Sequence, residues 1–182
     1  MLRVFDVVFA LIGLLCLWPV MVVIYVLGLF DTGSPVFIQQ RVGKHQRPFH
    51  LIKFRTMAVK TESVATHLAS RSAITPLGAF LRKTKLDELP QLINVLKGEM
   101  SLVGPRPCLF NQQELITERQ DRGVFEVLPG ITGLAQVSGI DMSTPQKLAQ
   151  CDQQMIKTMS VTHYFTYLVQ TVIGKGSGDR VR

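Results

Sequence analysis

The stretch VFDVVFALIGLLCLWPVMVVIYVLGLF, residues 4–30, decides the class of this protein. Asp6 is its one charged residue, and the run is long enough to reach through a hydrocarbon core of ~30 Å. It is longer than the apolar part of a secretory signal, and no small-residue cleavage site precedes Asp31. The sequence therefore predicts a membrane segment that stays on the mature chain.

Pro19 lies near the middle of this segment. A proline removes one backbone hydrogen bond and clashes with the preceding turn, so it can bend a helix sharply. The residues alone leave two arrangements open: a re-entrant helix that dips into the bilayer and returns, and a spanning helix that tolerates its proline. Arg3 and Asp6 would share one helix face, where they could neutralise each other at headgroup level or act as two interfacial anchors.

Charge and composition narrow the remaining classes. The chain of 182 residues suits one compact domain with appendages, and its net charge is +7. Most of its 20 Lys and Arg residues follow the apolar run, which favours a cytoplasmic location and attraction to anionic lipid. No nucleic-acid motif is present, so no nucleic-acid partner is expected. The three cysteines form no CxxC pair and the histidines show no ligand spacing, so a structural zinc is not expected.

The pattern beyond the membrane segment predicts a helix-rich α+β fold with a small hairpin. Strands are expected over 36–40 and 49–57, joined by a basic loop with Gly43 and Lys44. A weak helix is expected over 61–70, and firmer helices over 77–83, 87–97, 112–120, 145–159 and 161–173. The last helices should lie at the bilayer surface. We expect a membrane segment over 1–31, a catalytic domain over 32–174 and a flexible tail over 175–182, and a homodimer is left open.

An acidic pair, Asp87 and Glu88, precedes Leu89 and Pro90. Because proline is accepted in the first turn of a helix, the pair is predicted at the amino end of the 87–97 helix, where the dipole favours ionised carboxylates. One carboxylate could attack phosphorus while its neighbour holds Mg²⁺, an ion that prefers oxygen ligands. The alternative is ordinary helix capping, which the pair alone does not exclude.

Nearby basic residues favour the phosphoryl-transfer interpretation. Lys53 and Arg55 lie on a predicted strand, and Arg82 and Lys85 come just before the acids. Arg106 lies between two prolines, which fix the backbone and aim a guanidinium that suits a diphosphate. Each of the five could instead be a solvated surface charge.

Six motifs in one order resemble the bacterial sugar transferases known as monotopic phosphoglycosyl transferases. They are RVFD (3–6), KFRTM (53–57), LDELPQL (86–92), NVLKGEMS (94–101), GPRP (104–107) and PGITG (129–133). The resemblance implies a re-entrant amino-terminal helix broken at a proline, here Pro19, with the catalytic domain on the cytoplasmic face of the inner membrane. Members commonly have Ser before that proline, where this chain has Trp18.

The resemblance also implies a reaction. Asp87 would attack the β-phosphate of a UDP-sugar and release UMP, and polyprenol (undecaprenyl) phosphate would then take the phosphosugar from the aspartate. Glu88 matches the Mg²⁺ ligand. Such a reaction begins the membrane assembly of a glycan such as O-antigen, capsule or exopolysaccharide, so the implied partners are a UDP-sugar, polyprenol phosphate and membrane lipids.

The same resemblance assigns the remaining substrate-binding candidates. Arg82 and Arg106 match positions near the phosphates, and Lys53 and Arg55 match a basic strand near the site. Gln136 is a further candidate, but two residues later many relatives read Asn-Gly-Arg, where this chain has Ser138-Gly139-Ile140. The nucleotide or sugar would therefore be held differently here.

Two rival functions use the same residues differently. A Mg²⁺-dependent membrane phosphohydrolase would direct the carboxylates and arginines to water as acceptor. A non-catalytic membrane-surface adaptor would use Asp87 and Glu88 as helix caps only.

Overall fold

The computed structural model describes residues 2–59 and 73–174. Its elements in chain order are α1 (Leu2–Asp31), β1 (Val36–Val42), η1 (Lys44–Gln46), β2 (Pro48–Phe54), α2 (Pro76–Thr84), η4 (Leu86–Glu88), α3 (Gln91–Lys97), β3 (Ser101–Val103), α4 (Gln113–Asp121), η5 (Val124–Glu126), β4 (Gly130–Thr132), α5 (Leu134–Val137), α6 (Pro145–Thr158) and α7 (Val161–Val172). The α+β class predicted from the sequence is confirmed. The weak helix expected over 61–70 and the tail over 175–182 lie outside the described residues.

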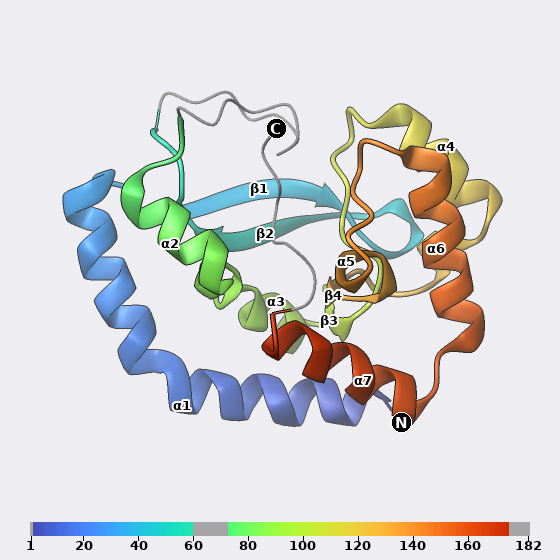
Figure 1. Ribbon diagram of the computed structural model, residues 1–182, viewed down its shortest axis with the longest axis horizontal. Coiled ribbons are helices and arrows are strands. Elements are labelled where there is room, and N and C mark those ends of the chain that lie inside the picture. Colours follow the sequence, from blue (N-terminus) through green and yellow to red (C-terminus); the bar gives the residue numbers. More distant parts are fainter. Residues whose placement is uncertain (1, 60–72, 175–182) are drawn as a thin grey trace.

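Helix α1 runs along the outside of the molecule and bends sharply near its middle (Figure 1). It is 30 residues long with Pro19 inside it, and it remains helical throughout, so the expected break takes the form of a bend. Its first half packs through Ala10 against a core cluster with Leu92 and Val95 of α3. Its second half packs through Ile24 against a separate cluster that includes Leu81 of α2.

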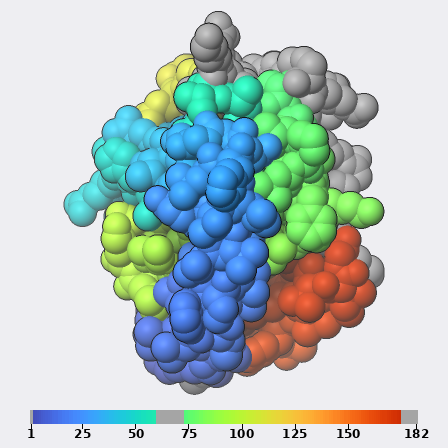
Figure 2. All heavy atoms as spheres, turned by 90° about the vertical axis from the view of Figure 1, so that its left-hand side faces the viewer, coloured from blue at the N-terminus to red at the C-terminus, as the bar shows by residue number. Residues whose placement is uncertain are grey.

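Most of α1 faces away from the protein. Only 11% of its most apolar 18-residue window is buried, and the helix is long and apolar enough to cross a membrane, by length and composition. Figure 2 shows α1 as an exposed ridge with α2 beside its upper part and α7 beside its lower part. Large apolar side chains are also exposed on these neighbours: Phe80, Val161, Val169, Val172 and Ile173. Exposed apolar side chains of α2 and α7 therefore flank the exposed apolar surface of α1.

The predicted hairpin is present as antiparallel β1 and β2, with Val36 opposite Phe54 and Val42 opposite Pro48. The second strand ends at Phe54, short of the expected end at Met57, and Met57 instead forms an isolated bridge with Ile74. The side chain of the fully buried Asn94 of α3 hydrogen-bonds to the backbone of β2, as a neighbouring strand would. Its Oδ1 accepts from Ile52 N at 3.1 Å and its Nδ2 donates to His50 O at 2.7 Å, so α3 is fixed against the edge of β2.

The helix expected over 87–97 begins later than predicted. Helix α2 ends at Thr84, the Lys85 that caps it has a left-handed φ of 59°, and residues 86–88 form the 3-10 turn η4 before α3 starts at Gln91. The acidic pair therefore lies in a tight turn between two helices and not in the first turn of α3. The reason is local, because the left-handed backbone of Lys85 separates the two helices and Pro90 has no N–H to donate. Until Gln91, backbone N–H groups therefore donate to the carbonyl three residues earlier, as in a 3-10 helix.

A second sheet, which the sequence did not indicate, forms from β3, just before the GPRP motif, and β4, within the PGITG motif. Strands β3 and β4 are parallel, with Ser101 opposite Gly130 and Val103 opposite Thr132. The carboxy-terminal half adds α4 and α6, which pack together, and α7, which lies beside the first half of α1. Its Phe165 meets the rings of Phe5 and Phe9 edge to face.

Candidate active site

The acidic pair is carried by a strained turn. Lys85, which precedes it, has a left-handed backbone that costs a residue other than glycine about 1–2 kcal/mol. Asp87 is 6% exposed, and the side chain of Glu88 is 13% exposed. Two adjacent carboxylates are thus held in a sheltered position, and backbone strain of this kind is concentrated at functional sites.

Arg106 meets Glu88 across the site. Its Nη2 donates to Glu88 Oε1 at 2.9 Å, and the two side chains are 25% and 13% exposed. The predicted acid and the predicted diphosphate-binding cation therefore come together, although they belong to different segments. Because Asp87 precedes Glu88 in the chain, the contact brings Arg106 to the turn that carries both acids.

The backbone that carries Arg106 is tied down at four consecutive carbonyl oxygens. Each accepts one hydrogen bond from another part of the chain: Pro105 O from Gly130 N (2.9 Å), Arg106 O from Arg119 Nη1 (2.8 Å), Pro107 O from Arg41 Nη1 (3.2 Å) and Cys108 O from Val42 N (2.9 Å). The prolines on both sides of Arg106 also restrict the backbone. The loop is therefore rigid, and the guanidinium that it presents is preorganised.

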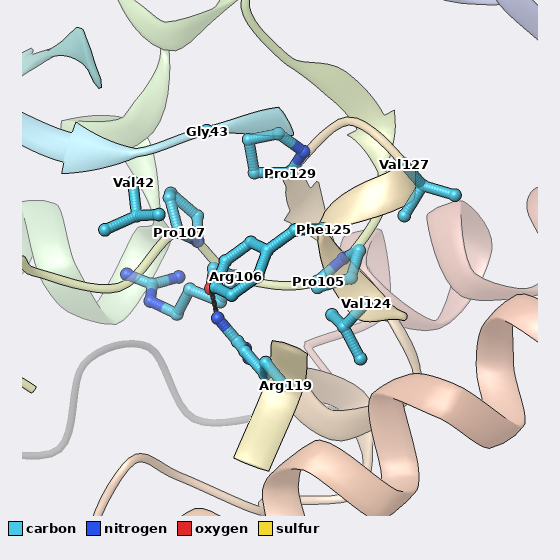
Figure 3. Close-up of a pocket in the computed structure, with 10 residues that line it drawn as sticks. All are labelled: Val42, Gly43, Pro105, Arg106, Pro107, Arg119, Val124, Phe125, Val127 and Pro129. Atoms are coloured by element: carbon cyan, nitrogen blue, oxygen red, sulfur yellow. Dashed lines mark hydrogen bonds between the residues drawn. The ribbon is translucent and has the colours of Figure 1, made fainter. Parts of the chain in front are cut away.

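The donor to the Arg106 carbonyl comes from a buried ion pair. Arg119 and Asp152 are 1% and 0% exposed, and Arg119 donates to Asp152 Oδ2 through Nε at 3.0 Å and Nη2 at 2.7 Å. Figure 3 shows Arg119 directed at the Arg106 carbonyl while the Arg106 guanidinium points away from it. Burial lowers the pKa of Arg119, but Asp152 and Cys108 together more than offset that shift, so its pKa is raised and the guanidinium stays charged.

Lys85 is a further basic residue close to the Glu88–Arg106 pair. Burial lowers its pKa, the Glu88 carboxylate opposes that shift, and Arg106 adds to the lowering. The side chain is thus within electrostatic reach of both members of the Glu88–Arg106 pair. Arg82, one turn earlier on α2, donates from Nε to the buried Thr56 Oγ1 at 2.8 Å.

Lys53 of β2 and Arg55, just beyond the end of that strand, are placed differently from each other. The charged ends of Lys53 and Arg55 lie 5.5 and 5.2 Å from the centre of the Phe37 ring. Lys53 is buried in a strand that packs against η4, so it belongs to the surroundings of the acidic turn. Arg55 donates to Ser34 O at 2.7 Å and to Val36 O at 3.3 Å, so its guanidinium holds the start of the hairpin.

The sequence also matches a known protein family. The family model described as bacterial sugar transferase matches residues 1–175. The chain belongs to this family. Membership makes it a transferase enzyme, as the sequence predicted, and counts against the non-catalytic adaptor.

Three relatives show how far the similarity extends. The chain is 43% identical to an uncharacterized sugar transferase, EpsL, of Bacillus subtilis, over 82% of the chain and 74% of the relative. It is 36% identical to the exopolysaccharide production protein ExoY of Rhizobium meliloti, over 93% and 83%. It is 38% identical to the UDP-glucose:undecaprenyl-phosphate glucose-1-phosphate transferase of Xanthomonas campestris, over 92% of the chain and 37% of that longer protein.

In this sugar transferase, Arg3 and Asp6 hold the start of α1 against α3, β3 and α7. Asp6 is 2% exposed, and its Oδ1 accepts from Ser101 Oγ (2.9 Å), Leu102 N (2.9 Å) and Tyr164 Oη (2.8 Å). Arg3 lies 3.6 Å from Asp6 Oδ2 and donates to Met100 O at 2.9 Å and to Val95 O. The pairing predicted from their spacing is present, and its partners are protein groups of α3, β3 and α7.

The segment that departs from the family pattern also has a structural role in the transferase. After α5, Gly139 takes a left-handed φ of 69° and Ile140 N donates back to Ala135 O at 2.9 Å. Ile140 then packs against the cluster that contains Leu148, so an apolar residue stands where the resemblance places an arginine. Gln136 on α5 has both amide atoms buried with no hydrogen-bond partner among the described residues, and its predicted contact with substrate remains a prediction.

The carboxylates of the transferase fit the way in which Mg²⁺ is usually bound. Among residues 2–59 and 73–174, no three His, Cys, Asp or Glu side chains gather into a group that could hold a metal. Mg²⁺ commonly takes one or two carboxylates and completes its shell with waters and substrate phosphates. Asp87 and Glu88 supply that donor set, and Glu88 is the expected ligand.

Sequence reasoning missed Arg119, Asp152 and Arg41. Arg119 lies in a polar helix where one more arginine carries no signal, and Arg41 lies one residue before the end of β1, close to other basic residues. Asp152 offered one weak sign, because it shares a helix face with Leu148 and Met155, which are apolar and buried. Their role depends on tertiary structure, because α4, α6 and β1 come together near the 105–108 loop only in the folded protein.

Proposed function

We propose that the chain transfers a sugar 1-phosphate from a UDP-sugar to polyprenol (undecaprenyl) phosphate through a covalent aspartyl phosphosugar, with release of UMP. The observation that carries the proposal is the Glu88–Arg106 contact of 2.9 Å beside the buried Asp87. The Xanthomonas relative, whose name states this type of reaction with UDP-glucose, supports it. The sugar and the glycan are not specified by these residues.

The chemistry divides into two displacements at one phosphorus atom. In the first, a carboxylate oxygen of Asp87 attacks the β-phosphorus, and the bond from that phosphorus to the oxygen shared with the α-phosphate breaks. UMP leaves with that oxygen, and the sugar phosphate is bonded to Asp87. In the second, a phosphate oxygen of the polyprenol phosphate attacks the same phosphorus, and the Asp87 carboxylate leaves. The product is a polyprenol diphosphate sugar, and Asp87 is regenerated.

Each neighbouring residue has a role that follows from its position. Arg106 binds the diphosphate with a rigidly held guanidinium and offsets the charge that UMP carries away. Arg106 also fixes Glu88 through their ion pair, so that the carboxylate faces the same phosphates. Bound at Glu88, Mg²⁺ would neutralise diphosphate charge. Lys53, Lys85 and Arg82 add positive potential around the turn.

The membrane helix places this site where both substrates can reach it. We propose that α1 re-enters the cytoplasmic leaflet of the inner membrane, with its bend near Pro19, and that the exposed apolar side chains of α2 and α7 rest on the same leaflet. A polyprenol phosphate carries its charge at the bilayer surface, whereas a UDP-sugar is dissolved in water. A monotopic enzyme meets both at that surface.

The covalent step can be tested without the acceptor lipid. Purified protein in detergent is incubated with a UDP-sugar panel and Mg²⁺, and the intact mass is measured. We expect one added sugar phosphate on Asp87 and one equivalent of UMP. The matched variant Asp87→Asn removes the nucleophile with almost no change in volume, so it should form neither product while keeping the melting temperature. UMP release with no added mass on the protein would contradict the covalent mechanism.

The same assay separates transfer from hydrolysis. If UMP release stops after one equivalent and resumes when polyprenol phosphate is added, the protein is a transferase with a lipid acceptor. Steady UMP release without lipid would favour the phosphohydrolase.

The re-entrant topology has its own test. A cysteine added ahead of Met1 in a variant without Cys16 should be protected from a membrane-impermeant thiol reagent in intact cells and should react after the inner membrane is opened. Reaction in cells with only the outer membrane permeabilised would show that α1 spans the bilayer.

A further inference from the structure

We propose that the buried Arg119–Asp152 ion pair is a positioning unit that holds Arg106 in the orientation needed to bind the substrate's diphosphate. The inference rests on the proposed function, because it assigns a task to the same site. Neither residue is part of a motif that indicated the reaction, and neither contacts Glu88. Their effect would pass through the Arg106 backbone.

The Arg119 guanidinium is held in one orientation by Asp152. Nε and Nη2 both donate to Asp152 Oδ2, at 3.0 and 2.7 Å, and Nη1 donates to Arg106 O at 2.8 Å. A guanidinium is planar, so the two bonds to Asp152 fix the direction of the third. Asp152 therefore aims Arg119, and Arg119 fixes the Arg106 carbonyl.

A fixed carbonyl at Arg106 also restrains the direction of the Arg106 side chain. The carbonyl orientation sets the peptide plane after Arg106, and Gly130 N fixes the plane before it by donating to Pro105 O at 2.9 Å. With both planes held, the Cα–Cβ direction of Arg106 is held too. Figure 3 shows the outcome: Arg119 approaches the carbonyl from one side, and the Arg106 guanidinium extends to the other. That guanidinium reaches Glu88 at 2.9 Å.

Stability does not account for a buried charged pair between α4 and α6. Removing two charges from water is costly, and buried ion pairs can often be replaced by apolar residues without loss of stability. Asp152 Oδ1 also has no hydrogen-bond partner among the described residues. An apolar contact between α4 and α6 would hold the helices together, but it could not hold a carbonyl oxygen.

The decisive variant replaces both charges, Arg119→Met with Asp152→Leu, so that no buried charge is left unpaired. We expect the melting temperature to change by only a few degrees, and the Michaelis constant for UDP-sugar to rise about tenfold or more. The control is the partly exposed Arg122–Glu118 pair, 2.5 Å apart at the same helix and not in contact with the loop. Changing both of those residues to Gln should leave the Michaelis constant unchanged.

Coupling to Arg106 distinguishes positioning from general stabilisation. If the pair acts through Arg106, adding Arg106→Gln to the double variant should reduce activity no further than Arg106→Gln alone. Multiplying losses, or an unchanged Michaelis constant in a folded double variant, would overturn the inference. Should the double variant fail to fold, Arg119→Lys serves instead: it keeps the charge beside Asp152 but cannot make three fixed bonds, and a normal Michaelis constant would again overturn the inference.

A binding measurement keeps the inference separate from the proposed reaction. Inorganic pyrophosphate should bind the wild-type protein, measured by calorimetry in detergent, and should bind the double variant about tenfold more weakly. Wild-type protein that binds pyrophosphate but turns over no UDP-sugar would refute the proposed function alone. Equal pyrophosphate binding by both proteins, or none by the wild type, would refute the positioning role.

Discussion

Arg106 and Glu88 are 18 positions apart in the chain, and Arg106 Nη2 lies 2.9 Å from Glu88 Oε1. The contact joins two segments of opposite character: a rigid loop held at four carbonyls and a strained turn between two helices. Neither segment alone forms a site. Together they place a fixed cation beside two sheltered carboxylates.

Arg106→Lys should lower kcat/KM for UDP-sugar by about 100-fold. Lysine keeps the charge but is a single point charge on a flexible stem, so it cannot bind phosphate and Glu88 in the fixed geometry of a guanidinium. Steady-state kinetics by UMP release would measure the loss. Arg122→Lys is the control, because the Arg122 guanidinium bonds to the backbone and the side chain of Glu118 on α4. Equal activity of Arg106→Lys and the wild type would show that the fork geometry is not used.

Asp6→Ala should destabilise the protein by about 3 kcal/mol, because it leaves several buried donors without their acceptor. Tyr164→Phe removes one hydroxyl donor to the same oxygen and should cost about 1 kcal/mol. Thermal unfolding in detergent would rank the two variants. If Tyr164→Phe proved as damaging as Asp6→Ala, the carboxylate would not be the centre of this network.

Gly130→Ala should disrupt the parallel β3–β4 pair and with it the Arg106 loop. A Cβ at Gly130 would lie 2.0 Å from the backbone nitrogen of Gly104, a distance that the backbone must relieve by moving. We expect loss of activity and a fall of several degrees in melting temperature. Gly123→Asn is the matched control, because Gly123 has a φ of +67° but open space around it, and Asn tolerates that backbone. Similar losses in the two variants would contradict a packing cause at Gly130.

The cysteines Cys108 and Cys151 should resist alkylation in the folded protein. Burial raises the pKa of Cys151 to about 11 and also raises the pKa of Cys108. Because the thiolate is the reactive form, only ~10⁻³ of Cys151 is reactive at pH 8, and its rate should rise about tenfold for each pH unit up to that pKa. Mass spectrometry after iodoacetamide treatment gives the rates, and guanidinium-unfolded protein gives the reference. Rapid labelling of Cys151 at pH 8 before unfolding would contradict this.

The sequence predicted those parts of the fold that depend on local signals. The hairpin followed from two β-prone runs around Gly43, and the helix boundaries of α4, α6 and α7 differ from the expected ones by one residue at each differing end. The acidic turn was placed wrongly because the left-handed backbone of Lys85 has no sequence signal: glycine or asparagine is the usual choice there.

The candidate site residues could be selected from the sequence, whereas the contacts that hold them in place could not. Asp87, Glu88 and Arg106 were identified by residue type and motif, and the Glu88–Arg106 contact follows that expectation. Arg55 was expected near the same site, but its guanidinium binds the backbone at Ser34 and Val36. The donors that fix the Arg106 loop come from strands and helices far along the chain. Contacts of that kind depend on tertiary packing, which local patterns do not record.

The bend of α1 also fixes a spacing. Its two halves pack against different helices: the half with Ala10 packs against α3, and the half with Ile24 packs against α2. The turn with Asp87 and Glu88 lies between those two helices. Straightening α1 would have to draw α2 and α3 apart and stretch the acidic turn between them. In the proposed arrangement, the bilayer that holds α1 in its bent form would therefore also set how Asp87 and Glu88 face the phosphates.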